Sequence, residues 1–225
     1  MPSRWHVHGR STIECVRRLR DWAGLLAPVV FVGTFLVEGW LRPGYDPRSM
    51  FVSELAIGPR GWVQDVNFFV SGALFLLFAW AMAAGLHEGK ASRAGPILLT
   101  IIGIGLFASA FFVTDPSTTP RDEVTVSGRI HSLFGALVFA LSPVSCFVFL
   151  RRFLADPMWR SLWPWTLAAG VITTVAVVLM AVGPAQPPAP PNAFNAWQGA
   201  IQRTFLITYM VWVFLVALRL RNRSA

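Results

Sequence analysis

Residues 131–150 read HSLFGALVFALSPVSCFVFL and contain no Lys, Arg, Asp or Glu. A helix of this length, at 1.5 Å per residue, spans about 30 Å, which is the thickness of the hydrocarbon core of a bilayer. Comparable runs lie outward from it on both sides, at approximately 22–41, 66–86, 95–113, 163–182 and 200–218. The runs are continuous rather than alternating, which favours helices over barrel strands. The sequence therefore predicts an all-α integral membrane protein, a bundle of six transmembrane helices occupying residues 22–218.

The composition supports this fold class. Of the 225 residues, 55% are hydrophobic and 13% are charged, and the charged share is about half that of a soluble domain. The formal net charge of +8 comes from basic residues in short segments between the apolar runs, where they act as topology signals. We therefore expect membrane lipids, and no nucleic acid, as partners.

The distribution of basic residues predicts an orientation. Thirteen of the 19 Lys and Arg residues fall in segments 1–21, 87–94, 151–162 and 219–225. Basic loops stay in the cytoplasm, so we expect segment 1–21 to be a basic cytoplasmic N-terminal segment and 219–225 a basic cytoplasmic tail. The prediction is a multi-pass protein of the plasma membrane with both termini inside.

Acidic residues are concentrated in the opposite set of segments, which this orientation places outside the cell. That set holds seven of the eleven: Glu38, Asp46, Glu54, Asp65, Asp115, Asp122 and Glu123. We therefore look for a polar site at the extracytoplasmic ends of the helices.

Three residues in these segments are candidate catalytic groups. Glu54 lies in FVSEL and could be a general acid or only the first-turn acid of a short helix. Asp115 precedes Pro116 and could equally be a turn residue. His131 is the one histidine in the predicted external segments, and an imidazole near carboxylates is suited to proton transfer.

Five further residues are candidate substrate-binding groups: Glu38, Asn67, Arg129, Gln202 and Arg203. Arg203 would lie slightly inside the membrane and needs a partner there. We expect either an ion pair with Glu38, Glu54 or Asp115, or an anionic headgroup or phosphate. Glu38 could instead be paired with Arg42, one turn further along the helix. No motif with metal-ligand or cofactor-binding spacing is present, so we expect no metal and no cofactor.

Several short motifs resemble one family in their order and spacing. They are Ser53-Glu54-Leu55, then Asn67 with Ser71-Gly72, then Thr114-Asp115-Pro116, then Gly128-Arg129-Ile130-His131, and finally Gln202-Arg203. This layout resembles the bacterial and archaeal family called domain of unknown function 998 (DUF998). The resemblance implies a six-span membrane fold and a membrane location, and it implies no particular activity.

Two functional hypotheses remain open. The first is an enzyme that acts on a lipid or isoprenoid, by headgroup hydrolysis or transfer or by proton-initiated cyclisation. The alternative is a non-enzymatic transporter or a structural partner subunit of a membrane complex, and the identity of any protein partner is left unknown by the sequence. The enzyme hypothesis predicts that Glu54, Asp115, His131 and Arg203 converge on one outward-open pocket.

Overall fold

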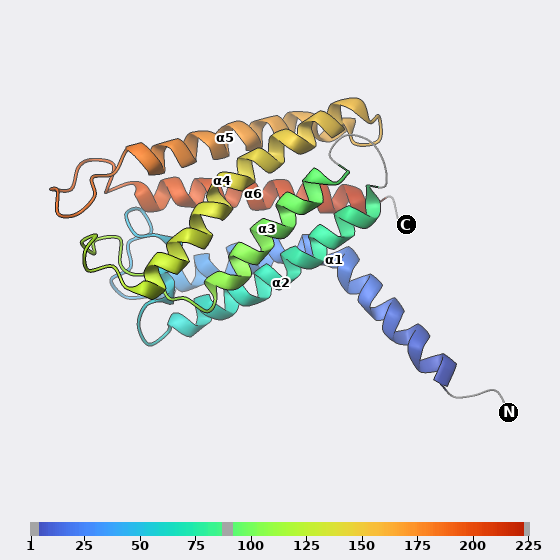
Figure 1. The fold of residues 1–225 in the computed structure, drawn as a ribbon, viewed down its shortest axis with the longest axis horizontal. Coiled ribbons are helices and arrows are strands. Elements are labelled where there is room, and N and C mark those ends of the chain that lie inside the picture. The colour runs from blue at the N-terminus through green and yellow to red at the C-terminus, as the bar shows by residue number, and fades with distance from the viewer. Residues whose placement is uncertain (1–4, 87–91, 223–225) are drawn as a thin grey trace.

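The structure, a computed structural model, describes residues 5–86 and 92–222, with side chains from residue 22 onward. Within these residues the chain forms six α-helices and two short 3₁₀ segments (Figure 1). In chain order they are α1 (Trp5–Leu41), η1 (Val52–Ala56), α2 (Gly61–Gly85), α3 (Ala94–Ser109), α4 (Val126–Ala155), η2 (Arg160–Leu162), α5 (Trp163–Val182) and α6 (Gln198–Arg221).

Each of the six predicted runs is helical, which confirms the prediction of a helical membrane bundle. Five apolar helical stretches in the described part of the chain are long enough to cross a bilayer. They are Trp22–Leu41, Gly61–Gly85, Val126–Ala155, Arg160–Val182 and Gln198–Arg221. Helix α3 is also apolar but has 16 residues, or about 24 Å at 1.5 Å per residue.

The helix ends differ from prediction around the connection between α3 and α4. Helix α3 ends at Ser109 rather than at residue 113, and α4 begins at Val126 rather than at residue 131. The side chain of Thr125 caps α4 early by accepting a hydrogen bond from the backbone N–H of Gly128 (3.0 Å). The first turn of α4 contains polar residues, and the predicted apolar run therefore began too late, at residue 131.

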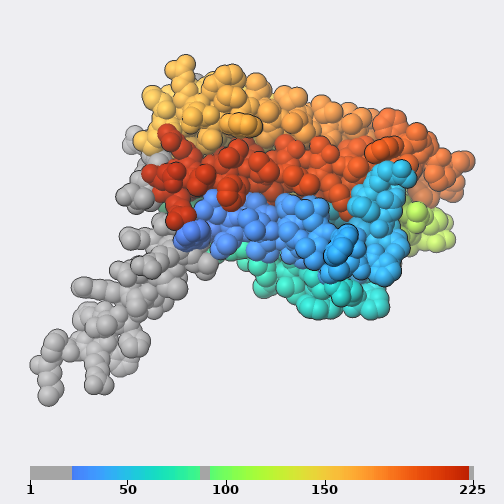
Figure 2. All heavy atoms as spheres, turned by 180° about the vertical axis from the view of Figure 1, so that it is seen from behind, coloured from blue at the N-terminus to red at the C-terminus, as the bar shows by residue number. Residues whose placement is uncertain are grey.

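The helices alternate in direction and form a closed ring. Each helix packs against the next one in the chain, and α6 packs back against α1. Figure 2, seen from behind, shows α6 running between α1 and α5. The connections 42–60, 110–125 and 183–197 gather at one end of the bundle, which we call the loop end (Figure 1).

Aromatic side chains fill the half of the ring far from the loop end. Phe153 stacks on Trp159 with ring centroids 5.1 Å apart, and Tyr209 stacks on Trp212 at 5.4 Å. The indole N–H of Trp212 donates to Thr166 Oγ1 (3.0 Å), so this buried polar atom is satisfied. Because large buried aromatic side chains fill that half of the helix bundle, any cavity is expected in the half at the loop end.

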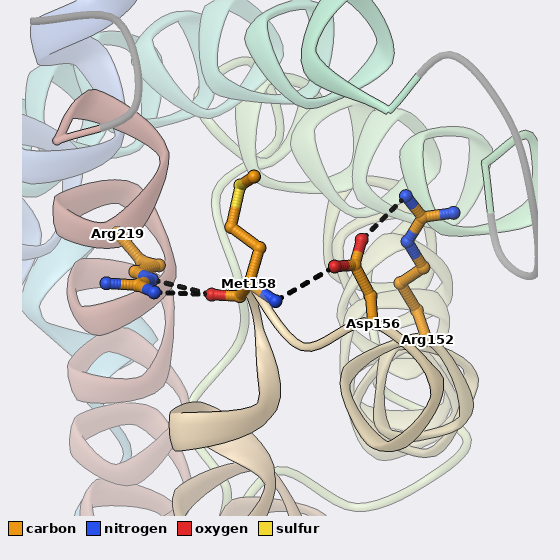
Figure 3. Close-up of polar contacts among 4 residues, drawn as sticks. All are labelled: Arg152, Asp156, Met158 and Arg219. Atoms are coloured by element: carbon orange, nitrogen blue, oxygen red, sulfur yellow. Dashed lines mark hydrogen bonds and ion pairs between the residues drawn. The ribbon is translucent and has the colours of Figure 1, made fainter.

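Polar contacts fix the end of the bundle opposite the loop end (Figure 3). Arg219 on α6 donates from Nε and Nη2 to the carbonyl of Met158 in the α4–α5 connection (2.8 and 2.6 Å). The carboxylate of Asp156 accepts hydrogen bonds from Arg152 and from the backbone N–H of Met158, both at 3.0 Å. These contacts tie the last helix to the connection between α4 and α5.

Candidate functional site

A cavity of about 540 Å³ lies inside the ring at the loop end, and we call it the central pocket. All six helices contribute to its walls, together with η1 and connections 110–125 and 183–197. Its deeper walls are apolar and include Phe31, Phe68, Leu106, Val138 and Leu206. These five side chains come from five different helices, so the pocket forms only when the ring of helices has assembled.

The mouth of the central pocket is polar. Asp115, Ser117 and Arg121 come from connection 110–125, and His131 and Gln202 come from the second turns of α4 and α6. The pocket therefore changes from polar at the loop end to apolar toward the middle of the bundle.

His131 is buried on the wall of the pocket, with 7% of its surface exposed. Its Nδ1 lies 2.7 Å from the carbonyl oxygen of Phe112, and its ring meets Phe68 edge-on at 5.7 Å. A carbonyl oxygen only accepts hydrogen bonds, so Nδ1 carries a hydrogen and Nε2 is the acceptor of the neutral ring. This tautomer presents one nitrogen for proton abstraction.

Asp115 is held against the first turn of α4. Its Oδ2 accepts hydrogen bonds from the backbone N–H of Thr125 (2.9 Å) and from the Thr125 hydroxyl (3.1 Å). The N-terminus of a helix favours a carboxylate at this position. A Cβ on Gly128 would lie 2.0 Å from Asp115 Oδ2, so the absence of a side chain there permits the contact. Asp115, from the α3–α4 connection, and His131, from α4, thus reach the same pocket.

Gln202 lines the pocket and also holds η1 in place. Its side-chain oxygen accepts a hydrogen bond from the backbone N–H of Val52 (2.7 Å). One turn earlier, Gln198 donates to the hydroxyl of Ser117 (3.0 Å). The start of α6 therefore positions two separate connections over the central pocket.

Glu54 does not line the central pocket. It borders a second cavity of about 410 Å³ together with Arg42, Tyr45 and Arg60. Its carboxylate accepts a hydrogen bond from the backbone N–H of Phe51 (2.9 Å), which caps η1. The structure thus places Glu54 in the support of the loop that covers the central pocket, apart from Asp115 and His131.

Arg203 also lies outside the central pocket, and the expected ion pair is wrong. Its Nη1 donates to the carbonyls of Pro47 (2.6 Å), Met50 (2.9 Å) and Gly199 (3.0 Å). Its Nη2 donates to the hydroxyl of Tyr45. Neutral oxygens take the place of the predicted carboxylate, and they fix connection 42–60 on α6. Burial raises the pKa of the Tyr45 phenol, although Arg203 beside it acts to lower that pKa.

Glu38 is buried and pairs with Arg60, whose Nε and Nη2 reach its two oxygens at 3.2 and 2.5 Å. The alternative that Arg42 is its partner is wrong, because the Arg42 guanidinium donates instead to the Glu54 carbonyl (3.1 Å). The pair joins the end of α1 to the start of α2 beside the second cavity.

Asn67 is buried and crosslinks two helices. Its side-chain N–H group donates to the carbonyl of Phe31 (3.1 Å) and its oxygen accepts from Ser71 (3.2 Å). Arg129, by contrast, is exposed on the outer face of α4 and lines neither cavity. Neither residue lies where it would touch a molecule in the central pocket.

Two residues at the mouth were missed by the sequence analysis: Ser117 and Arg121. The polar segment STTPRDE at 117–123, between the T-D-P motif and α4, was the available signal. Within the described residues, no three His, Cys, Asp or Glu side chains gather to hold a metal ion. The chemical groups offered to a ligand are an imidazole, a carboxylate, a guanidinium, hydroxyls and an amide.

Comparison with known proteins gives a family and no closer relative. The family described as "Protein of unknown function (DUF998)" matches residues 25–219, which is most of the chain and includes every residue of both cavities. No curated protein and no solved structure gives a significant match.

Proposed function

The chain belongs to the DUF998 family, a membrane family without an assigned activity, and we propose that it binds a lipid-like molecule in the central pocket and acts on the polar end of that molecule. The observation that carries this proposal is the change of character along a single cavity. Asp115, Arg121 and His131 lie at its mouth, and Phe31, Phe68 and Leu206 lie deeper. An amphiphile satisfies both halves at once.

The apolar part of the pocket supplies binding energy. Removing a hydrocarbon chain from water contributes about 0.8 kcal/mol per methylene. For a ligand that is already in the membrane, the gain comes instead from close contact with the pocket walls. The polar mouth then selects the headgroup, because a buried polar group without a partner costs about 1–3 kcal/mol.

The polar mouth suits headgroup hydrolysis or transfer. Nε2 of His131 accepts the proton of an attacking water or hydroxyl and returns it to the leaving group. Arg121 supplies a guanidinium for an anionic headgroup. Asp115 is used as a hydrogen-bond acceptor by Thr125, which suits orientation of a substrate hydroxyl better than the proton donation that a cyclisation requires.

The site faces the outside of the cell in this proposal. The excess of Lys and Arg in the segments at the opposite end supports that orientation in a plasma membrane. The alternative is a lipid-binding partner subunit without a reaction, and the structural roles of Arg203, Glu38 and Asn67 favour it. Transport is less well supported, since aromatic side chains fill the half of the ring beyond the pocket.

A comparison of cellular lipids tests the proposal. Cells expressing the wild-type chain, His131→Gln and Arg129→Gln at equal levels are extracted, and their lipids are quantified by mass spectrometry. We expect one lipid class to be converted by the wild type and by Arg129→Gln, which alters an exposed residue on the same helix. His131→Gln should lower the conversion at least 100-fold, the scale of general base catalysis. Identical lipid profiles for wild type and His131→Gln would overturn the proposal that the protein is an enzyme and would leave the alternative of a lipid-binding partner subunit.

A further inference from the structure

We infer that the central pocket opens sideways into the membrane between α4 and α5, and that its ligand is a membrane lipid whose hydrocarbon chain occupies this opening. The inference rests on the proposed function and adds the route by which the substrate reaches the site. It depends on which pocket-lining residues are also exposed on the outside of the ring.

One face of α4 lines the pocket and is exposed at the same time. Ser132, Ala136 and Ala140 follow each other at intervals of four residues, all three line the central pocket, and all three are exposed. Residues spaced by four lie on one face of a helix. On α5, Met180 and Ala181 line the same cavity, and Ala181 is exposed as well. This part of the cavity wall consists of exposed residues on two neighbouring helices, and it marks the opening in the side of the bundle.

The opening lies at the depth of lipid chains. From Ser132 to Ala140 it extends about 12 Å along α4, and Ala140 lies about 21 Å from the start of that helix at Val126. The hydrocarbon core of a bilayer is about 30 Å thick. An opening that reaches the middle of a membrane-spanning helix therefore meets acyl or isoprenoid chains rather than water.

Small side chains make room for such a chain. The opening contains Gly135, Ala136 and Ala140, and a Cβ placed on Gly135 would meet only a ring carbon of Phe139 at 3.9 Å. Several other glycines in the ring mark tight contacts, as at Gly72, where a Cβ would lie 2.5 Å from the backbone of Phe107. Gly135 thus borders space rather than a neighbouring helix.

The loop end is a less favourable entrance, because η1 covers it and is fixed there. Val52 is bonded to Gln202, and the backbone N–H of Ala200 donates to the carbonyl of Arg48 (2.9 Å). Arg203 adds the contacts to the same connection described above. A loop held to α6 by this many hydrogen bonds covers the mouth of the pocket, which leaves the side opening as the route from the membrane.

Photochemical labelling in native membranes tests the inference. Two probes separate the possible sources of the chain: a diazirine-bearing fatty acid that cells incorporate into acyl lipids, and a diazirine-bearing polyprenyl alcohol. After irradiation the protein is isolated and its adducts are mapped by mass spectrometry. We expect one probe to label Phe68 and Leu206, which are 6% exposed and out of reach of surrounding lipid. Both probes should label Val171, which is 47% exposed on α5.

Two variants close the opening, and each has a matched control. Ala136→Phe blocks its middle, whereas Leu137→Phe adds a ring to the next residue of α4, which is exposed and outside the pocket. Gly135→Leu fills the space inside, whereas Gly33→Leu makes the same change on α1, where a Cβ meets nothing within 4 Å. We expect Ala136→Phe and Gly135→Leu to lower pocket adducts at least tenfold and the two controls to leave them unchanged.

The outcomes separate the inference from the proposed function. Wild-type protein with adducts on Val171 but none on Phe68 and Leu206 from either probe would overturn both, because no lipid chain would occupy the pocket. Pocket adducts that persist in both Ala136→Phe and Gly135→Leu would overturn the side opening alone and leave lipid binding in place.

Discussion

Replacing Gly128 by alanine should displace Asp115 from the candidate site. An added Cβ would lie 2.0 Å from Asp115 Oδ2, whereas ordinary contacts begin at 3.4 Å. The carboxylate must therefore move by about 1.4 Å, since 3.4 − 2.0 = 1.4. Its hydrogen bonds to Thr125, now 2.9 and 3.1 Å long, cannot both survive this movement.

The expected cost follows from three contributions. The two lost hydrogen bonds, with exposed Thr125 as donor, amount to about 1–3 kcal/mol. Overpacking adds about 1–3 kcal/mol. The higher helix propensity of alanine offsets up to about 1 kcal/mol of this loss of stability. At mid-range these contributions leave a net loss of about 3 kcal/mol, which corresponds to a fall in Tm of roughly 6–12 °C for a chain of this size.

Thermal unfolding of the purified protein in detergent measures this loss. Gly135→Ala is the matched control, because it makes the same change on the same helix where a Cβ has room, and it should be neutral or stabilising by about 1 kcal/mol. In an Asp115→Ala background the Gly128→Ala change should cost about 1 kcal/mol or less, since the clashing carboxylate is gone. Equal losses in the two backgrounds would refute the close approach of Gly128 to Asp115.

Three further predictions concern the loop end. Arg203→Ala should lower the free energy of unfolding by about 2–4 kcal/mol and speed chymotryptic cleavage within connection 42–60 at least tenfold. The control Arg129→Ala should change stability by less than about 0.5 kcal/mol. Equal cleavage rates in the two variants would contradict the anchoring role of Arg203. Arg60→Gln should lower Tm more than Glu38→Gln, because it leaves a buried carboxylate unpaired while the reverse change leaves a half-exposed cation in water; the opposite order would argue against the burial of Glu38. Burial raises the pKa of Tyr45, so the neutral phenol stabilises the fold fully below the unfolded pKa of about 10, and this contribution is lost as pH rises through the folded value; Tm should therefore fall as pH rises above about 10 in the wild type and fall less in Tyr45→Phe.

The helices were predictable because lipid imposes a simple rule. Every segment inside the hydrocarbon must satisfy its own backbone, so an uncharged run of sufficient length has one available structure. The same rule says little about the ends. The first turn of α4 contains Ser127 and Arg129 and was left out of the run, although Thr125 caps a helix that includes them.

The candidate site was predictable where neighbouring helices carry it. Asp115 lies in the α3–α4 connection and His131 lies near the start of α4, so a helical hairpin brings them to the same end of the bundle. Arg203 and Glu54 were harder to assign, because their partners are backbone groups of connection 42–60. Backbone donors and acceptors have no signature in the sequence, and a search for opposite charges could not find them. Arg121 was missed because no charge or apolar pattern distinguishes a loop arginine that borders a cavity.

The closure of the ring by α6 has a consequence for biogenesis. During synthesis each newly inserted helix meets a partner that has just entered the membrane, because successive helices are neighbours. The contact between α1 and α6 is different, because it can form only after the last helix has left the translocation machinery. Until then Val52 lacks its glutamine acceptor, and the apolar wall around Phe31 faces lipid. A nascent chain that stops before Gln198 is therefore an open ring of five helices. Membrane quality-control proteases would meet this form, and the insertion of the final helix covers its exposed apolar surface.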